Sequence, residues 1–214
     1  MKTDALIAML AAGPVRADRS TTARRIGMAT AAGGAVALVA MLLFLPPRPD
    51  LSAAALTPMF WLKLALPLIA GVAAFAATTR LARPGGSARI PASVLAALVA
   101  SLWLLAAIVV AATPTGGRRI EVVGATALPC VASIVALALP LLVAAFVALR
   151  SLAPTQPRAA GLAAGTLAGA VAAFVYAVHC TETTVPFFAV WYVLGIAASA
   201  ALGAALGPRW LRWR

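Results

Sequence analysis

Acidic residues are scarce in this sequence. Its 214 residues include 5 Asp and Glu against 17 Lys and Arg, so charged residues make up only 10% of the chain, while 64% are hydrophobic. A soluble domain is about half apolar and roughly a quarter charged. So few charges cannot cover the surface of a water-soluble globule. The composition therefore excludes a cytosolic enzyme, a soluble DNA-binding domain and a disordered tail.

Groups that perform chemistry are also rare. The chain has one His and contains no Gly-x-Ser-x-Gly or His-Glu-x-x-His motif. No acid lies in the middle of a long apolar run, although a proton-coupled transporter needs ionisable groups inside the membrane. We therefore expect a protein that is not an enzyme. A small transporter or permease without a membrane carboxylate is the main alternative.

Apolar stretches long enough to cross a bilayer, which takes about 20 helical residues, recur six times. Segments of alternating polarity, typical of an outer-membrane barrel, are absent. We predict an all-α polytopic membrane protein with a six-helix bundle, because in lipid each backbone amide must be satisfied within its own helix. Pro67 and Pro140 predict kinks in the second and fourth spans. The expected spans are about 27–45, 60–79, 91–112, 124–149, 159–178 and 186–206.

Basic residues gather on one side of this predicted bundle, which places both termini in the cytoplasm. Arg118 and Arg119 run against this rule, because they fall in an outer loop. Lys63 lies about one turn inside the second span, and we expect its ammonium to extend to the outer interface. The thirteen basic residues on the inner side are Lys2, Arg16, Arg19, Arg24, Arg25, Arg80, Arg83, Arg89, Arg150, Arg158, Arg209, Arg212 and Arg214.

The chain then divides into a cytoplasmic segment (1–25), a transmembrane domain (26–208) and a basic tail (209–214). The positive charge favours contact with anionic lipid. No loop is long enough to form a module that reads nucleic acid, so we expect no direct contact with nucleic acid.

Small residues recur at every fourth position in the fifth and sixth spans. Such residues let helices approach closely, and packing drives helix association in lipid. We expect these faces to pack against each other or against another subunit. They are Gly161, Gly165 and Gly169 in the fifth span, and Gly195, Ser199 and Gly203 in the sixth.

Two cysteines, 50 positions apart, are expected on the same outer side. Cys130 lies early in the fourth span, which enters from that side, and Cys180 follows the fifth span, which exits there. Three interpretations stay open: a disulfide in an oxidising compartment, a soft-metal site completed by His179 or Glu182, or two buried thiols that act as small hydrophobic side chains. The absence of Cys-x-x-Cys disfavours a thiol oxidoreductase.

The N-terminal segment predicts one short helix. Thr3 is a suitable cap, and Leu6, Ile7 and Leu10 follow at helical spacing. A helix this short is marginal alone in water. We expect its apolar face to be covered by the membrane surface or by a groove on a soluble protein. The remaining alternative is that residues 1–25 form a poorly ordered terminus.

Several short motifs, taken in order, resemble the NrsF family of bacterial inner-membrane anti-sigma factors. With the six spans, the similarity covers nearly the whole chain. The motifs are Thr3-x-x-Leu6-Ile7, Phe60-x-x-Lys63, Arg83-Pro84-Gly85, Pro129-Cys130, Cys180-x-Glu182, Trp191-Tyr192, Leu206-Gly207-Pro208-Arg209 and Leu211-Arg212-Trp213.

This resemblance implies that the N-terminal segment captures an extracytoplasmic-function (ECF) sigma factor of the sigma-F type in the cytoplasm. The face of Leu6, Ile7 and Leu10 would make the contact. The resemblance also implies that Cys130 and Cys180 take part in sensing heavy-metal stress, such as chromate or cadmium, which leads to release. No cofactor is obligatory, and a heavy-metal ion would bind the cysteines only transiently.

Overall fold

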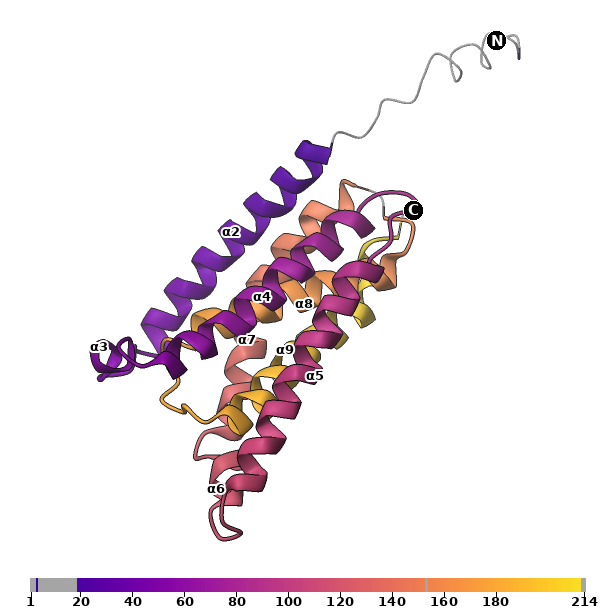
Figure 1. The fold of residues 1–214 in the computed structure, drawn as a ribbon. Coiled ribbons are helices and arrows are strands. Elements are labelled where there is room, and N and C mark those ends of the chain that lie inside the picture. Colours follow the sequence, from indigo (N-terminus) through magenta and orange to yellow (C-terminus); the bar gives the residue numbers. More distant parts are fainter. Residues whose placement is uncertain (1–2, 4–18, 153, 213–214) are drawn as a thin grey trace.

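The computed structural model describes residues 3, 19–152 and 154–212, and every regular element in these residues is helical (Figure 1). This confirms the all-α class. The predicted N-terminal capture helix lies outside the described residues except for Thr3. The helices are α2 (Arg19–Phe44), α3 (Leu51–Ala54), α4 (Pro58–Leu81), α5 (Arg89–Ala112), α6 (Arg118–Val123), α7 (Ala127–Arg150), α8 (Pro157–Tyr176) and α9 (Val185–Trp210).

The six long helices are each apolar and long enough to cross a membrane, as expected from the sequence. The short helices α3 and α6 were not expected. Helix α6 contains Arg118 and Arg119 in its first turn. Gly124 separates α6 from α7 with a φ of +55°, a conformation that favours glycine because a side chain there is strained.

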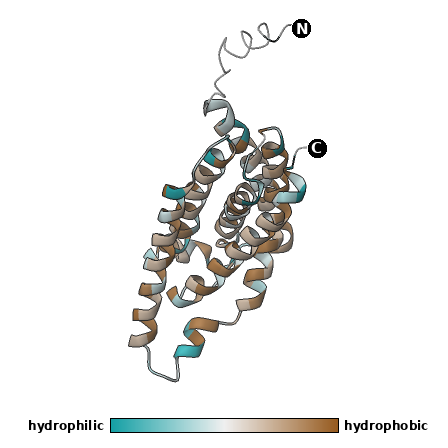
Figure 2. Cartoon of the chain, turned by 90° about the vertical axis from the view of Figure 1, so that its right-hand side faces the viewer, coloured by the Kyte–Doolittle hydropathy of each residue, from teal (hydrophilic) through white to brown (hydrophobic). Residues whose placement is uncertain are grey.

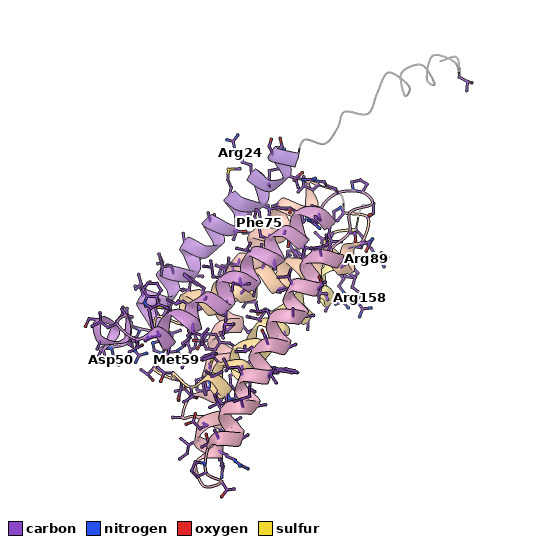
Figure 3. The ribbon with its side chains drawn as sticks, viewed as in Figure 1. Arg24, Asp50, Met59, Phe75, Arg89 and Arg158 are labelled. Atoms are coloured by element: carbon purple, nitrogen blue, oxygen red, sulfur yellow. The ribbon has the colours of Figure 1, made fainter. Side chains whose placement is uncertain are left out.

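The two ends of the bundle differ in composition. One end, here the α3/α6 end, contains α3, α6 and the segment 177–184, and the opposite, basic end contains the start of α2 and the end of α9 (Figure 1). Figure 2 shows hydrophobic residues along most of the helices. In Figure 3, Arg24, Arg89 and Arg158 lie toward the basic end, and Asp50 lies at the other.

Helix α8 is the most enclosed of the six, and α5 is the most peripheral. In the most apolar window of each helix, 72% of the α8 positions are buried against 6% of the α5 positions. Helix α8 packs on α4, α7 and α9, whereas α5 packs mainly on α9 and α4. The Ala- and Gly-rich sequence of α8 explains this placement, because small side chains let neighbouring helices approach on several sides.

The small-residue faces of α8 and α9 meet each other. A methyl group at Gly165 would lie 2.8 Å from the Cα atom of Ala200, which leaves no room for a side chain. Gly195 differs, because it packs on Ile134 of α7. The other positions in the α8–α9 contact are Gly161, Gly169, Ser199, Gly203 and Gly207.

The helices continue across the two prolines for which kinks were predicted: α4 across Pro67 and α7 across Pro140. At the second of these, α2 comes close. A methyl group at Gly33 would lie 2.7 Å from the Cα atom of Leu141 and 3.2 Å from the carbonyl oxygen of Pro140. Gly33 therefore permits the backbone of α2 to pack directly on α7.

Candidate functional site

The structure brings Cys130 and Cys180 together at the α3/α6 end of the bundle. Cys130 lies in the first turn of α7 and Cys180 lies in the segment between α8 and α9. Both are free and buried, with exposed fractions of 0% and 3%. The two thiols interact through a hydrogen bond. A pair distant in sequence therefore becomes a single dithiol unit.

Lys63 of α4 supplies a positive charge beside the two thiols. The expectation that its ammonium extends to the outer interface is wrong. Its side chain does not extend to the interface but is buried, with 1% exposed. Its Nζ donates hydrogen bonds to the carbonyl oxygens of Cys180 (2.8 Å) and Glu182 (2.7 Å). The segment 177–184 is not helical, so its carbonyl oxygens lack helical hydrogen-bond donors. They accept hydrogen bonds from the Lys63 ammonium, whose burial without acceptors would be costly.

Two tyrosines enclose the dithiol and the ammonium. The Nζ of Lys63 lies 5.5 Å from the centroid of the Tyr192 ring, within the range of a cation–π contact. The rings of Tyr176 and Tyr192 lie 6.2 Å apart. The Tyr192 hydroxyl is turned toward Cys180 and, within the described residues, has no hydrogen bond of ordinary geometry. We call Lys63, Cys130, Tyr176, Cys180 and Tyr192 the thiol–lysine cluster.

The two side chains considered as additional metal ligands contact loop backbone instead. His179 Nδ1 lies 2.7 Å from the carbonyl oxygen of Pro46. The Glu182 carboxylate accepts a hydrogen bond from the backbone N–H of Ala125 at 2.8 Å. Across the described ranges, no three or more His, Cys, Asp and Glu side chains gather as a metal site would require. His179 and Glu182 therefore connect segment 177–184 to the two other loops at this end.

A pocket of about 270 Å³ leads to the dithiol. Cys180 lines it, whereas Cys130 does not. Arg48, also in the lining, forms an ion pair with Asp50 at 2.7 Å and keeps its Nη1 buried, without a partner among the residues described. The remaining lining residues are Pro46, Pro47, Pro49, Thr126, Tyr176, His179 and Thr181.

Asp50 and Cys180 lie outside the spanning helices, and both are more acidic than usual. A hydrogen bond from the Arg48 guanidinium lowers the pKa of the Asp50 carboxyl. The pKa of the Cys180 thiol is also lowered, first by the hydrogen bond from Cys130 and then by the nearby Lys63 ammonium, against the opposing effect of burial. Cys180 is therefore the thiol that more readily becomes a thiolate, the nucleophilic form.

A family model, NrsF, described as "Negative regulator of sigma F", matches residues 10–213. The chain belongs to the NrsF family. No solved structure matches it.

Two NrsF relatives are similar over their full lengths. The "Probable anti-sigma-F factor NrsF" of Azospira oryzae is 40% identical over 213 residues. The "Anti-sigma-F factor NrsF" of Caulobacter vibrioides is 39% identical over 215 residues. In each case 100% of both chains is covered. These names describe regulators of a sigma factor rather than enzymes.

For this member of the NrsF family, sequence reasoning missed several residues of the site. Lys63 and Tyr192 occur in the motifs Phe60-x-x-Lys63 and Trp191-Tyr192, but no role followed from those motifs. The available signal was Lys63 itself, the single cation within the predicted spans. Arg48 and Tyr176 gave no signal, because their roles depend on which loops and helix ends meet.

Proposed function

We propose that this NrsF-family chain is a membrane-bound anti-sigma factor that sequesters an ECF sigma factor of the sigma-F type. In this proposal the segment 1–25 holds the sigma factor in the cytoplasm. Heavy-metal or oxidative stress acts on Cys130 and Cys180 and leads to release. The observation that carries the sensing part is the contact of these two free thiols, which come from separate elements.

The distribution of charge supports the orientation. Arg24, Arg89 and Arg158 lie toward the basic end (Figure 3), and positive residues concentrate on the cytoplasmic side of membrane proteins. We infer a bacterial inner-membrane protein with both termini in the cytoplasm. The thiol–lysine cluster then faces the periplasm, where thiols meet oxidants.

The packing around the dithiol supports a two-state sensor. The segment 177–184 is held by Lys63 and is joined to two other loops through His179 and Glu182. A disulfide or a thiolate–metal bond changes the geometry of this segment, which connects α8 and α9. A ligand shifts such an equilibrium only by favouring one packing over the other, so release requires that the modified pair fits the second packing better.

Capture is assigned to the predicted N-terminal helix. Its apolar residues Leu6, Ile7 and Leu10 have the spacing of a helix that docks in a groove, and Thr3 is placed to cap it. A helix this short needs a partner surface, which the sigma factor supplies. No cofactor is required for this step.

The test is a C130S/C180S double variant in cells that carry a reporter driven by a sigma-dependent promoter. We expect repression without stress and no induction by cadmium or chromate. The C130S and C180S single variants separate the two contributions, and membrane levels of each protein are measured in parallel. Normal induction in the double variant would contradict the sensing role, and loss of repression would show that the cysteines support capture instead.

A further inference from the structure

The two thiols of the cluster differ in access. Cys180 lines the pocket of about 270 Å³ at the α3/α6 end, whereas Cys130 is absent from its lining and has no exposed surface. A molecule that enters this pocket therefore meets Cys180 and not Cys130. The sulfur of Cys130 lies within hydrogen-bonding reach of it.

We propose that Cys180 reacts first with a small electrophile in this pocket, that Cys130 then closes a disulfide with it, and that Lys63 is a positioning residue for the first step. This order rests on the proposed sensing role of the two cysteines. It adds a separate role for each cysteine and a third residue, Lys63, on which the reaction depends.

Lys63 interacts with both the backbone and the thiol of Cys180. Its Nζ bonds to the carbonyls of Cys180 and Glu182 and so fixes the backbone on both sides of Thr181. The same ammonium interacts with the Cys180 thiol. A cation beside a thiol favours the thiolate. Asp50 does not cancel this charge, because its carboxylate is paired with Arg48.

The pocket also indicates the chemical class of the molecule. Arg48 lines it with an Nη1 group that is buried and unpaired in the described part of the chain, and an unsatisfied buried donor gains from an acceptor. The volume admits a small molecule only. We infer a small electrophile that has an acceptor oxygen and a leaving group, the class to which thiosulfonates belong.

Methyl methanethiosulfonate is the probe for this order. The Cys180 thiolate attacks the sulfenyl sulfur, the S–S bond of the reagent breaks, and methanesulfinate leaves with the electron pair. Cys130 then attacks the Cys180 sulfur of the mixed disulfide, and methanethiolate leaves and takes the proton of Cys130. The two cysteines lose two electrons in total, and the reagent is reduced to methanesulfinate and methanethiol.

The experiment treats the purified full chain in detergent with this reagent and follows both cysteines by mass spectrometry. In the unmodified sequence we expect a methylthio group on Cys180 before any on Cys130, followed by the intramolecular disulfide. In C130S the methylthio group on Cys180 should persist. In C180S the labelling of Cys130 should be about tenfold slower, or more, than the labelling of Cys180 in the unmodified sequence, since Cys130 does not line the pocket.

Lys63 is tested by K63M and K63R, with R118M as the matched control, since Arg118 is an exposed cation at the same end. We expect slow labelling of Cys180 in K63M, partial recovery in K63R and no change in R118M. The role of Lys63 would be overturned if Cys180 were labelled at the same rate in K63M as in the parent chain, or at the same rate in K63M as in K63R. First labelling of Cys130, or equal labelling of both cysteines, would overturn the order. These measurements need no sigma factor, so they fail or succeed separately from the proposed function.

Discussion

The ammonium of Lys63 donates a hydrogen bond to the backbone carbonyl of Cys180, a residue 117 positions later, with Nζ and O 2.8 Å apart. This bond joins α4 to the non-helical segment that carries one of the two thiols. The bond is buried, and a second carbonyl, that of Glu182, shares the same donor.

Removal of the Lys63 ammonium should destabilise the α3/α6 end. K63M leaves two carbonyls without their donor, and an unsatisfied buried group costs about 1–3 kcal/mol. We expect a lower midpoint of thermal unfolding in detergent and faster proteolysis of the 177–184 segment. R118M should match the parent chain, and an unchanged midpoint in K63M would show that the carbonyls find other donors.

The reactivity of Cys180 should persist at lower pH than that of an ordinary thiol, whose pKa is about 8.5. Because the pKa of Cys180 is lowered chiefly by the Cys130 hydrogen bond, its thiolate form is present below that value and is lost only as the pH falls through the lowered pKa. In C130A, which has no donor at this position, this bond is absent, so the midpoint should move to higher pH. Iodoacetamide labelling of the Cys180 peptide between about pH 5 and pH 9 measures both midpoints. A C130A midpoint at or below that of the parent chain would contradict this cause.

Enlarging the α8 face should disrupt the bundle. In G165A the new methyl group meets the backbone of Ser199 and Ala200, and overpacking of this kind costs about 1–3 kcal/mol. The matched control is G116A, where a methyl group meets nothing within 4 Å and the change should stay within about 0.5 kcal/mol. Thermal unfolding in detergent compares the two. Equal unfolding midpoints for G165A and G116A would mean that α8 and α9 can move apart to admit the methyl group at little cost in stability.

The N-terminal segment should be required for capture but not for membrane insertion. We expect the L6D/I7D/L10D variant to lose the sigma factor in pull-downs from gently solubilised membranes, because charge opposes the docking of an apolar face. The A5D/A8D/A12D variant adds the same charge to the opposite face of the predicted helix and should keep the partner. Deletion of residues 1–14 should give constitutive transcription. Continued repression by an inserted, truncated chain would assign capture to another part of the protein.

The sequence was sufficient for the six long helices, because apolar runs of this length have few other stable arrangements in lipid. It was not sufficient for Lys63. The rule that lysines near a span end extend to the interface takes no account of a non-helical segment that offers buried carbonyls. His179 and Glu182 bind backbone groups of loops far away in sequence, and no local pattern encodes such contacts. The short helices α3 and α6 lie in segments whose proline and glycine content suggested loops.

The contrast between the enclosed α8 and the peripheral α5 has an evolutionary consequence. On α8, most changes add volume where backbones touch, so selection should hold its Ala and Gly residues nearly constant. On α5, one apolar residue can replace another against lipid with little effect on packing. The differences that separate this chain from relatives about 40% identical to it should therefore accumulate on α5 and at other lipid-facing positions, while α8 changes slowly.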